Sequence, residues 1–146
     1  MMKLLNSSTT LPTKLLLIMP TTTYQTDAIS LVSLVDDVNK EQEIEQFTYQ
    51  LIERLQANYD KQYPQLEGQN YHDPVRFEVK RGRKFLKVIQ TKGGVHAFID
   101  KKTGDVFKPA SWNKPAQHVR YNLLDNRSRT VCFERCDWAG GYLYLR

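Results

Sequence analysis

The chain has 146 residues, of which 40% are hydrophobic and 25% are charged, and its formal net charge is +5. This composition is typical of a soluble globular protein of one domain. Its longest apolar run, residues 15–19, is far shorter than the roughly twenty residues of a membrane span, so a membrane-spanning segment is excluded.

Charge is divided unequally between the two halves of the chain. Residues 1–74 hold 5 Lys and Arg against 10 Asp and Glu, whereas residues 75–146 hold 16 against 6. A basic half that also contains most of the aromatic residues is typical of a protein that contacts a polyanion. The pattern does not identify the polyanion, and a solvated lysine-rich surface would give the same counts.

The N-terminal residues show no regular period. Residues 1–26 are rich in Ser and Thr and contain Pro12 and Pro20. They are predicted to form a disordered tail, followed by a single domain over residues 27–146. Within that domain, Ala28–Val35 is a short apolar stretch whose pattern fits a helix as well as a strand.

The first clear element is a helix over residues 39–59. Asn39 is placed as its N-cap, with Gln42 three residues later in a capping-box arrangement, and Pro64 follows the expected end. Apolar residues recur along the helix at spacings of three and four, which predicts a face that packs on a sheet. These residues are Ile44, Phe47, Leu51 and Leu55.

Four strands are expected next, joined by short turns. The first begins at Val75 and alternates apolar with charged residues, the period of a half-buried strand. The others are expected at residues 84–91, 95–100 and 105–108, with Gly104 in the left-handed position of the last turn. Such short connections favour an antiparallel meander.

The last part of the chain is expected to be helical and then extended. Pro115 suits a first helical turn, which predicts a helix at residues 116–124. A second helix is expected from Ser128 to Asp137, followed by a terminal strand at residues 142–145. The predicted fold class is α+β: an antiparallel meander of four to five strands packed against one long amphipathic helix, with short C-terminal helices.

Basic residues crowd the first two predicted strands and their connecting turn. Between Arg76 and Lys92 only Glu78 opposes them, so outward-facing residues would form a positive strip that contacts phosphates. Aromatic residues lie among these charges, and rings on a basic sheet stack on the bases of single-stranded nucleic acid. We therefore expect non-specific binding of nucleic acid, with single strands favoured. The candidate binding residues are Arg81, Arg83, Lys84, Lys87, Lys101, Lys102, Lys108, Trp112, Lys114, Arg120 and Tyr121.

The alternative is that the rings belong to the core and the charges only keep the protein soluble. Phe85, Phe98 and Phe107 lie on predicted strands, and strand alternation places some of them on whichever face is buried. A basic exposed face that carries rings would favour nucleic acid. A flat apolar face rimmed by charge would favour a protein partner.

No catalytic, cofactor or metal motif stands out, so we expect a protein that is not an enzyme and holds no cofactor. His96 is expected on one strand face with Phe98 and Asp100, but no nucleophile is placed beside it by spacing. Cys132 and Cys136 are one pair, without the second pair that a structural zinc site needs. They are predicted to be buried thiols in a reducing, cytoplasmic protein.

Residues 95–122 read VHAFIDKKTGDVFKPASWNKPAQHVRYN, and residues 137–142 read DWAGGY. This block resembles a signature of small proteins of tailed bacteriophages, many of them marine, that have no known activity. The resemblance covers about residues 75–146, and the signature has lysine where this chain has Gln117. It implies an origin and no mechanism: a phage accessory protein in the cytoplasm of an infected bacterium. The rival functions are a module that binds and inhibits a host protein and a minor component of the virion.

Overall fold

A computed structural model describes residues 21–64 and 75–145, with side chains from Leu31 onward. Its helices are α2 (Thr21–Gln62), α3 (Asn126–Arg135) and the 3-10 helix η2 (Gly141–Leu143). Its strands are β2 (Phe77–Arg81), β3 (Phe85–Gln90), β4 (Gly94–Asp100), β5 (Asp105–Phe107) and β6 (Tyr121–Asn122). The chain divides between Val38 and Asn39 into two compact units, and α2 contributes to both.

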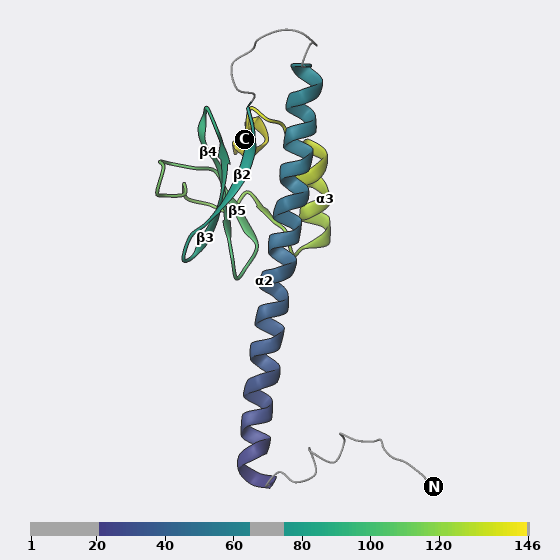
Figure 1. Ribbon diagram of the computed structural model, residues 1–146, viewed down its shortest axis with the longest axis vertical. Coiled ribbons are helices and arrows are strands. Elements are labelled where there is room, and N and C mark those ends of the chain that lie inside the picture. Colours follow the sequence, from purple (N-terminus) through teal and green to yellow (C-terminus); the bar gives the residue numbers. More distant parts are fainter. Residues whose placement is uncertain (1–20, 65–74, 146) are drawn as a thin grey trace, which may run out of the picture. The chain divides into compact units, whose positions relative to one another are not determined.

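The strands form one five-stranded sheet in the order β2-β3-β4-β5-β6, each antiparallel to its neighbour (Figure 1). The predicted α+β class with an antiparallel meander is therefore confirmed. The turn between β4 and β5 depends on Gly104, whose φ of 80° is left-handed as predicted. A Cβ at this position would also lie 3.2 Å from the side chain of Leu124, which would have to shift slightly to accommodate it.

Helix α2 begins earlier than the sequence pattern indicates. It starts at Thr21, so the prediction of an N-cap at Asn39 is wrong, and Asn39 lies inside the helix. No Pro or Gly occurs between residues 21 and 38, and without such a residue the helix continues through the capping pattern.

Because α2 starts early, it also includes part of the N-terminal region. The apolar stretch Ala28–Val35, which fitted either element, is helical. Residues 21–26 of the predicted tail belong to the same helix, whereas residues 1–20 of that tail lie outside the described residues. The helix ends at Gln62, close to the predicted end before Pro64.

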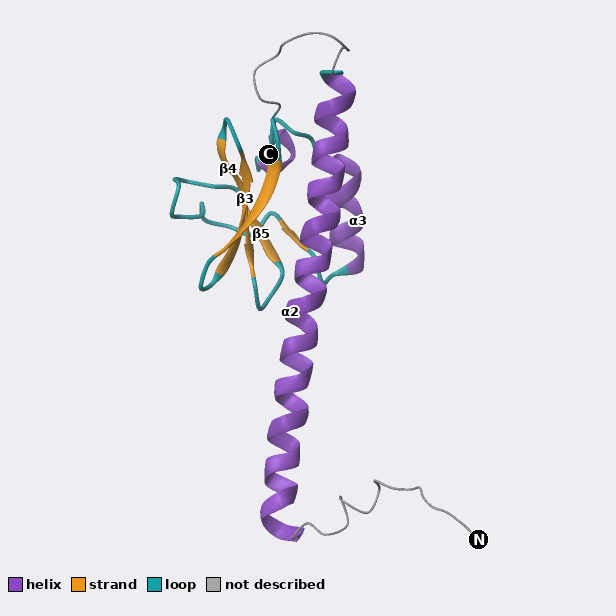
Figure 2. Ribbon diagram, in the orientation of Figure 1, coloured by secondary structure: helices purple, strands orange, loops and turns teal. Residues whose placement is uncertain are grey.

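The core of the second unit lies between α2, the sheet and the C-terminal segment. Ile44, Leu51 and Leu55 of α2 are fully buried in one apolar cluster with Leu86 and Val88 of β3. The predicted stripe on this helix is therefore a core face. Figure 2 shows that α3 and the C-terminal part of α2 cover the same side of the sheet. The opposite side of the sheet is called the outer face below.

A β-bulge redirects one residue of β4. The register between β3 and β4 shifts at Val88 and Ile89, so β4 has one residue more than its partner there. As a result, the ring of His96 contacts Phe77 edge-on and lies beside Tyr142, on the side of the core. The expectation that His96 shares a face with Phe98 is wrong, because a strict alternation does not survive an inserted residue.

The predicted helix at residues 116–124 is absent, because its backbone groups bond to β5 and to Lys108, the residue after it. The N–H of Ala116 donates to the carbonyl of Lys108 at 2.7 Å, and the N–H of Arg120 donates to the carbonyl of Val106 at 2.8 Å. Residues 121–122 then pair with β5 as strand β6. Cross-strand bonds thus replace the bonds that a helix would have needed.

The other two C-terminal predictions are also corrected. Asp125, and not Ser128, caps α3: its carboxylate accepts hydrogen bonds from the N–H groups of Arg127 and Ser128. The Ser128 hydroxyl instead accepts from the N–H of Asn122 at 2.8 Å. The expected terminal strand is η2, which follows Gly140 in its left-handed conformation.

Replacing Leu51 by Ala is expected to destabilise the protein by about 2–4 kcal/mol, because it leaves a cavity under a fully buried helix face. Chemical denaturation measures the change. The control is Gln50→Ala, at the exposed neighbouring position, which should stay within about 0.5 kcal/mol of the wild type. Equal effects of the two substitutions would show that this face of α2 is not core.

Candidate nucleic-acid interface

One row of directly opposed residues crosses the outer face. The register pairs Lys80 of β2 with Lys87 of β3, Lys87 with Phe98 of β4, and Phe98 with Phe107 of β5. Directly opposed residues of antiparallel strands lie on the same face. The row therefore places two cations beside two aromatic rings on the side of the sheet away from α2.

The phenylalanine rings of this face form a small cluster apart from the main core. Phe85 packs edge-on against Phe98, with 5.6 Å between ring centroids, and against Phe107, at 6.0 Å. Phe98 is buried, and the Lys87 ammonium lies 5.7 Å from its ring centroid, whereas Phe85 and Phe107 are half-buried. The two interpretations of these rings are thus both partly correct: they lie on the basic face, and the central one is covered.

A loop folds an exposed ring onto the same face. Residues 108–116, called the Trp112 loop, lie on the side of the sheet away from α2 in Figure 1. The loop is closed by the backbone bridge between Pro109 and Pro115, and Asn113 accepts a hydrogen bond of 3.1 Å from the Lys87 ammonium. The Trp112 side chain remains 47% exposed.

Two ammonium groups lie over the Trp112 ring. The distance to the ring centroid is 4.9 Å from Lys87 and 5.9 Å from Lys80, both within range of a cation–π interaction. Lys80 belongs to the positive strip predicted between Arg76 and Lys92, but it was not among the candidate binding residues. The alternation of side chains along β2 places Lys80 on the same face as Glu78. Only the strand register shows that Lys80 lies directly opposite Lys87.

Four candidate residues gather at one end of the sheet, where the β2–β3 and β4–β5 turns are adjacent. The Lys101 N–H donates to the carbonyl of Lys84 at 3.0 Å, and the Lys101 ammonium donates to the carbonyl of Gly82 at 3.2 Å. Asp100 is the nearby acid, but its carboxylate accepts from two N–H groups of its own turn. This basic end consists of Arg83, Lys84, Lys101 and Lys102.

Two of the remaining candidates are engaged within the fold. Arg81 forms an ion pair with Glu45 of α2. The Arg120 guanidinium donates to the carbonyls of Leu143, Gln117 and His118, so it holds the backbone together. Lys108 lies over the ring of Tyr144, and Lys114 is exposed in the Trp112 loop.

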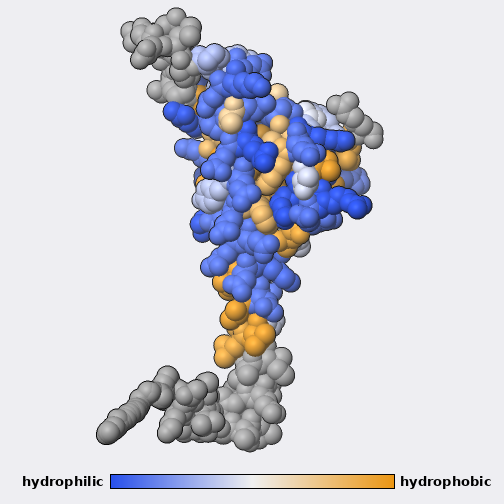
Figure 3. All heavy atoms as spheres, turned by 90° about the vertical axis from the view of Figure 1, so that its right-hand side faces the viewer, coloured by the Kyte–Doolittle hydropathy of each residue, from blue (hydrophilic) through white to orange (hydrophobic). Residues whose placement is uncertain are grey.

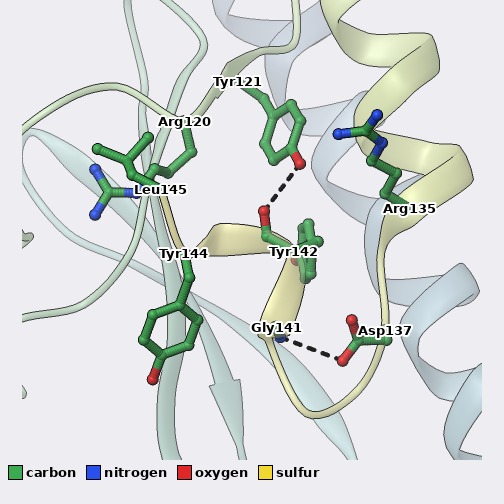
Figure 4. A pocket seen from close by; sticks show the side chains of 8 residues that line it. All are labelled: Arg120, Tyr121, Arg135, Asp137, Gly141, Tyr142, Tyr144 and Leu145. Carbon is green, nitrogen blue, oxygen red and sulfur yellow. Dashed lines mark hydrogen bonds between the residues drawn. The ribbon is translucent and has the colours of Figure 1, made fainter.

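Tyr121 lines a separate crevice of about 600 Å³ between β6, the end of α3 and η2 (Figure 4). Its hydroxyl donates to the carbonyl of Tyr142 at 2.9 Å, and the two rings are stacked. Burial raises the pKa of the Tyr121 hydroxyl, and the Arg135 guanidinium, which points toward it, acts in the opposite direction. Tyr121 is therefore bonded to and packed against other parts of the fold, and its ring does not lie on the outer face.

His96 is held inside the fold. It shares a hydrogen bond of 2.8 Å with the Tyr142 hydroxyl, and burial lowers its pKa to about 4 against the opposing charge of Asp137. The imidazole is therefore neutral at physiological pH. Burial likewise raises the pKa of the Cys132 thiol to about 12. Burial also raises the pKa of the half-buried Cys136 thiol, so both cysteines are protonated.

Within residues 21–64 and 75–145, no helix is both long and apolar enough to cross a membrane. Over the same part of the chain, His, Cys, Asp and Glu side chains do not gather in a group of three that could hold a metal ion.

The chain belongs to a family of unknown function (DUF7717), whose model matches residues 33–145. The match includes the whole sheet, α3 and η2, so the outer face and the crevice both lie in the region that defines the family. No curated protein and no solved structure matches the chain.

Acidification is expected to destabilise the fold through His96. Its pKa is about 4 in the folded protein and about 6.5 in the unfolded chain, so between these values only the unfolded chain binds the proton. Stability is therefore lost as the pH falls from about 6.5 to 4, by roughly 3 kcal/mol in all. Chemical denaturation across this range measures the loss. His96→Gln should show a shallower dependence, and an identical dependence would contradict this role of the imidazole.

Proposed function

We propose that this member of the family binds single-stranded nucleic acid without sequence preference, through the outer face of its sheet. The main supporting observation is Trp112, whose half-exposed ring has the ammonium groups of Lys80 and Lys87 over it. A ring that stacks on a base and cations that neutralise phosphates are the two components of such sites. An exposed face that is basic and carries rings favours nucleic acid over a protein partner.

The charges of this face suggest a direction for the bound strand. The basic end at the β2–β3 and β4–β5 turns would hold the sugar–phosphate backbone, because Arg83, Lys84 and Lys102 are exposed there. The strand would then cross the Lys80–Lys87 row to the Trp112 loop. Lysine contacts to phosphate release counterions and do not distinguish bases, so binding of this kind is non-specific and depends on salt.

We also infer the biological setting from the sequence resemblance of residues 95–122. A tailed-bacteriophage accessory protein acting in the cytoplasm of an infected bacterium fits a small basic chain with two free cysteines. Non-specific affinity for single strands is compatible with such a role.

A second candidate function is binding to a host protein, or a minor place in the virion. One observation favours a protein partner: apolar side chains of α2 are more than half exposed (Figure 3). They are Leu31, Val32, Leu34, Val35 and Val38. Their spacing places Leu31, Leu34 and Val38 on one face of the helix, as in a surface that meets another protein. If the outer face does not bind nucleic acid, this function becomes the leading one.

Removing the two lysines of the row, as Lys80→Gln with Lys87→Gln, should weaken single-strand binding and change its salt dependence. Each lost phosphate contact flattens the slope of log affinity against log salt by about 0.7. Fluorescence anisotropy with a labelled single-stranded oligonucleotide at several salt concentrations gives both quantities. Lys40→Gln with Lys61→Gln, an equal loss of two charges at exposed positions of α2, is the matched control and should leave the slope unchanged. Arg81 is left intact because its ion pair with Glu45 joins the sheet to α2.

Replacing Trp112 by Ala should weaken binding by about 1–3 kcal/mol and leave the salt slope unchanged, because stacking releases no counterions. The same titrations measure this. A wild-type protein that does not bind at low salt would refute the proposed function.

A further inference from the structure

A cleft lies beside Trp112, between the Trp112 loop and the turn that joins β3 to β4. Its volume is about 330 Å³, near the lower end of the range for small-molecule sites. Gly93 and Gly94 form one side, Pro109 and Ala110 form the other, and Trp112 also contributes to the lining. A cleft of this size suits one planar ring and not a stack of several.

The walls of the cleft are made mostly by small residues, and they combine apolar with polar surface. On the turn side, Gly94 has a φ of 92° and no atom within 4 Å of the place where a Cβ would lie, so this side is open. Val95 supplies an apolar surface from the start of β4, and Pro109 and Ala110 supply another. Flat apolar walls favour burial of a ring face, because such a face gains more from leaving water than a charged or flexible group does.

The loop side of the cleft is fixed before any ligand arrives. The N–H groups of Ala110 and Ser111 both donate to the carbonyl of Lys114, at 2.9 and 3.0 Å. The bridge between Pro109 and Pro115 closes the base of the same loop. A wall held by its own backbone bonds loses little conformational freedom on binding, which favours affinity.

The cleft also has polar features that match a nucleotide. Lys87, whose ammonium is bonded to Asn113 and lies over the Trp112 ring, places positive charge at the cleft's margin, where the phosphates next to an inserted base would be. Ser111 is among the lining residues, and its hydroxyl is a group that either donates or accepts a hydrogen bond. Such a group accommodates the edge of any base, in keeping with binding without sequence preference.

We infer that this cleft receives one unpaired nucleobase of the bound strand, seated against Trp112 with its neighbouring phosphates at Lys80 and Lys87. The inference rests on the proposed function and deepens it. The outer face holds the backbone by charge, and the cleft holds one base by burial and stacking. A base of a duplex is already stacked and paired, so it is not free to enter the cleft. The cleft thus accounts for a preference for single strands.

The test fills the cleft without changing charge. Ala110→Leu adds volume at an exposed position of the loop, and Ala139→Leu makes the same change at an exposed position outside the cleft. Fluorescence anisotropy compares both variants with the wild type, on a single-stranded oligonucleotide and on an abasic strand of equal length. Filling the cleft should weaken binding of the normal strand about five- to a hundredfold with an unchanged salt slope. Ala139→Leu should bind like the wild type.

The abasic strand separates the two proposals. The wild type should bind it more weakly than the normal strand, whereas Ala110→Leu should bind the two strands with nearly equal affinity. If Ala110→Leu binds the normal strand as tightly as the wild type does, the cleft holds no base, and the outer-face proposal stands without it. If the wild type binds neither strand at low salt, both proposals fail.

Discussion

The burial of α2 against one face of the sheet is the constraint on which the rest of the structure depends. Leu51 and Leu55 need an apolar partner surface, and Leu86, Val88 and Ile99 supply it from the central strands. Side chains alternate between the faces of a strand, so once these residues point to α2, their neighbours must point away. The basic row lies on the outer face because the residues beside it in each strand point into the core.

The same constraint separates charges that hold the fold from charges that are free for a partner. Arg81 is tied to Glu45, and Arg129 lies over the ring of Phe47, so both join α2 to the elements around it. Arg120 is bonded to the backbone carbonyl of Leu143 in η2 and to those of Gln117 and His118. The lysines of the outer face have no such acidic partners among the described residues, and they lie over aromatic rings instead. This division explains why net charge alone could not define an interface.

The Trp112 loop turns a charged sheet face into a shaped site. An isolated row of lysines and half-buried rings would attract a polyanion but would offer little to a base. The loop adds an exposed ring, brings Asn113 to Lys87 and encloses a cleft against the glycine turn. The loop joins β5 to β6, and the Pro109–Pro115 bridge that closes it lies outside the strands of the sheet. The shape of the proposed site therefore depends on backbone bonds of the loop itself.

The sequence by itself determined the α+β class, the core stripe of α2, strands β2 to β5 and the basic character of the second half, because local periods of two and 3.6 residues encode them. Only the tertiary structure decided the rest. Strand β6 replaced a predicted helix because its residues pair with β5 and the preceding Arg120 N–H bonds to Val106, and the bulge turned His96 into the core. Of the candidate residues, Arg81, Arg120 and Tyr121 proved to be bonded within the fold. Lys80, which was not a candidate binding residue, lies with Lys87 over the ring of Trp112. Pairing and packing are set by residues far apart in the chain, and no local period records them.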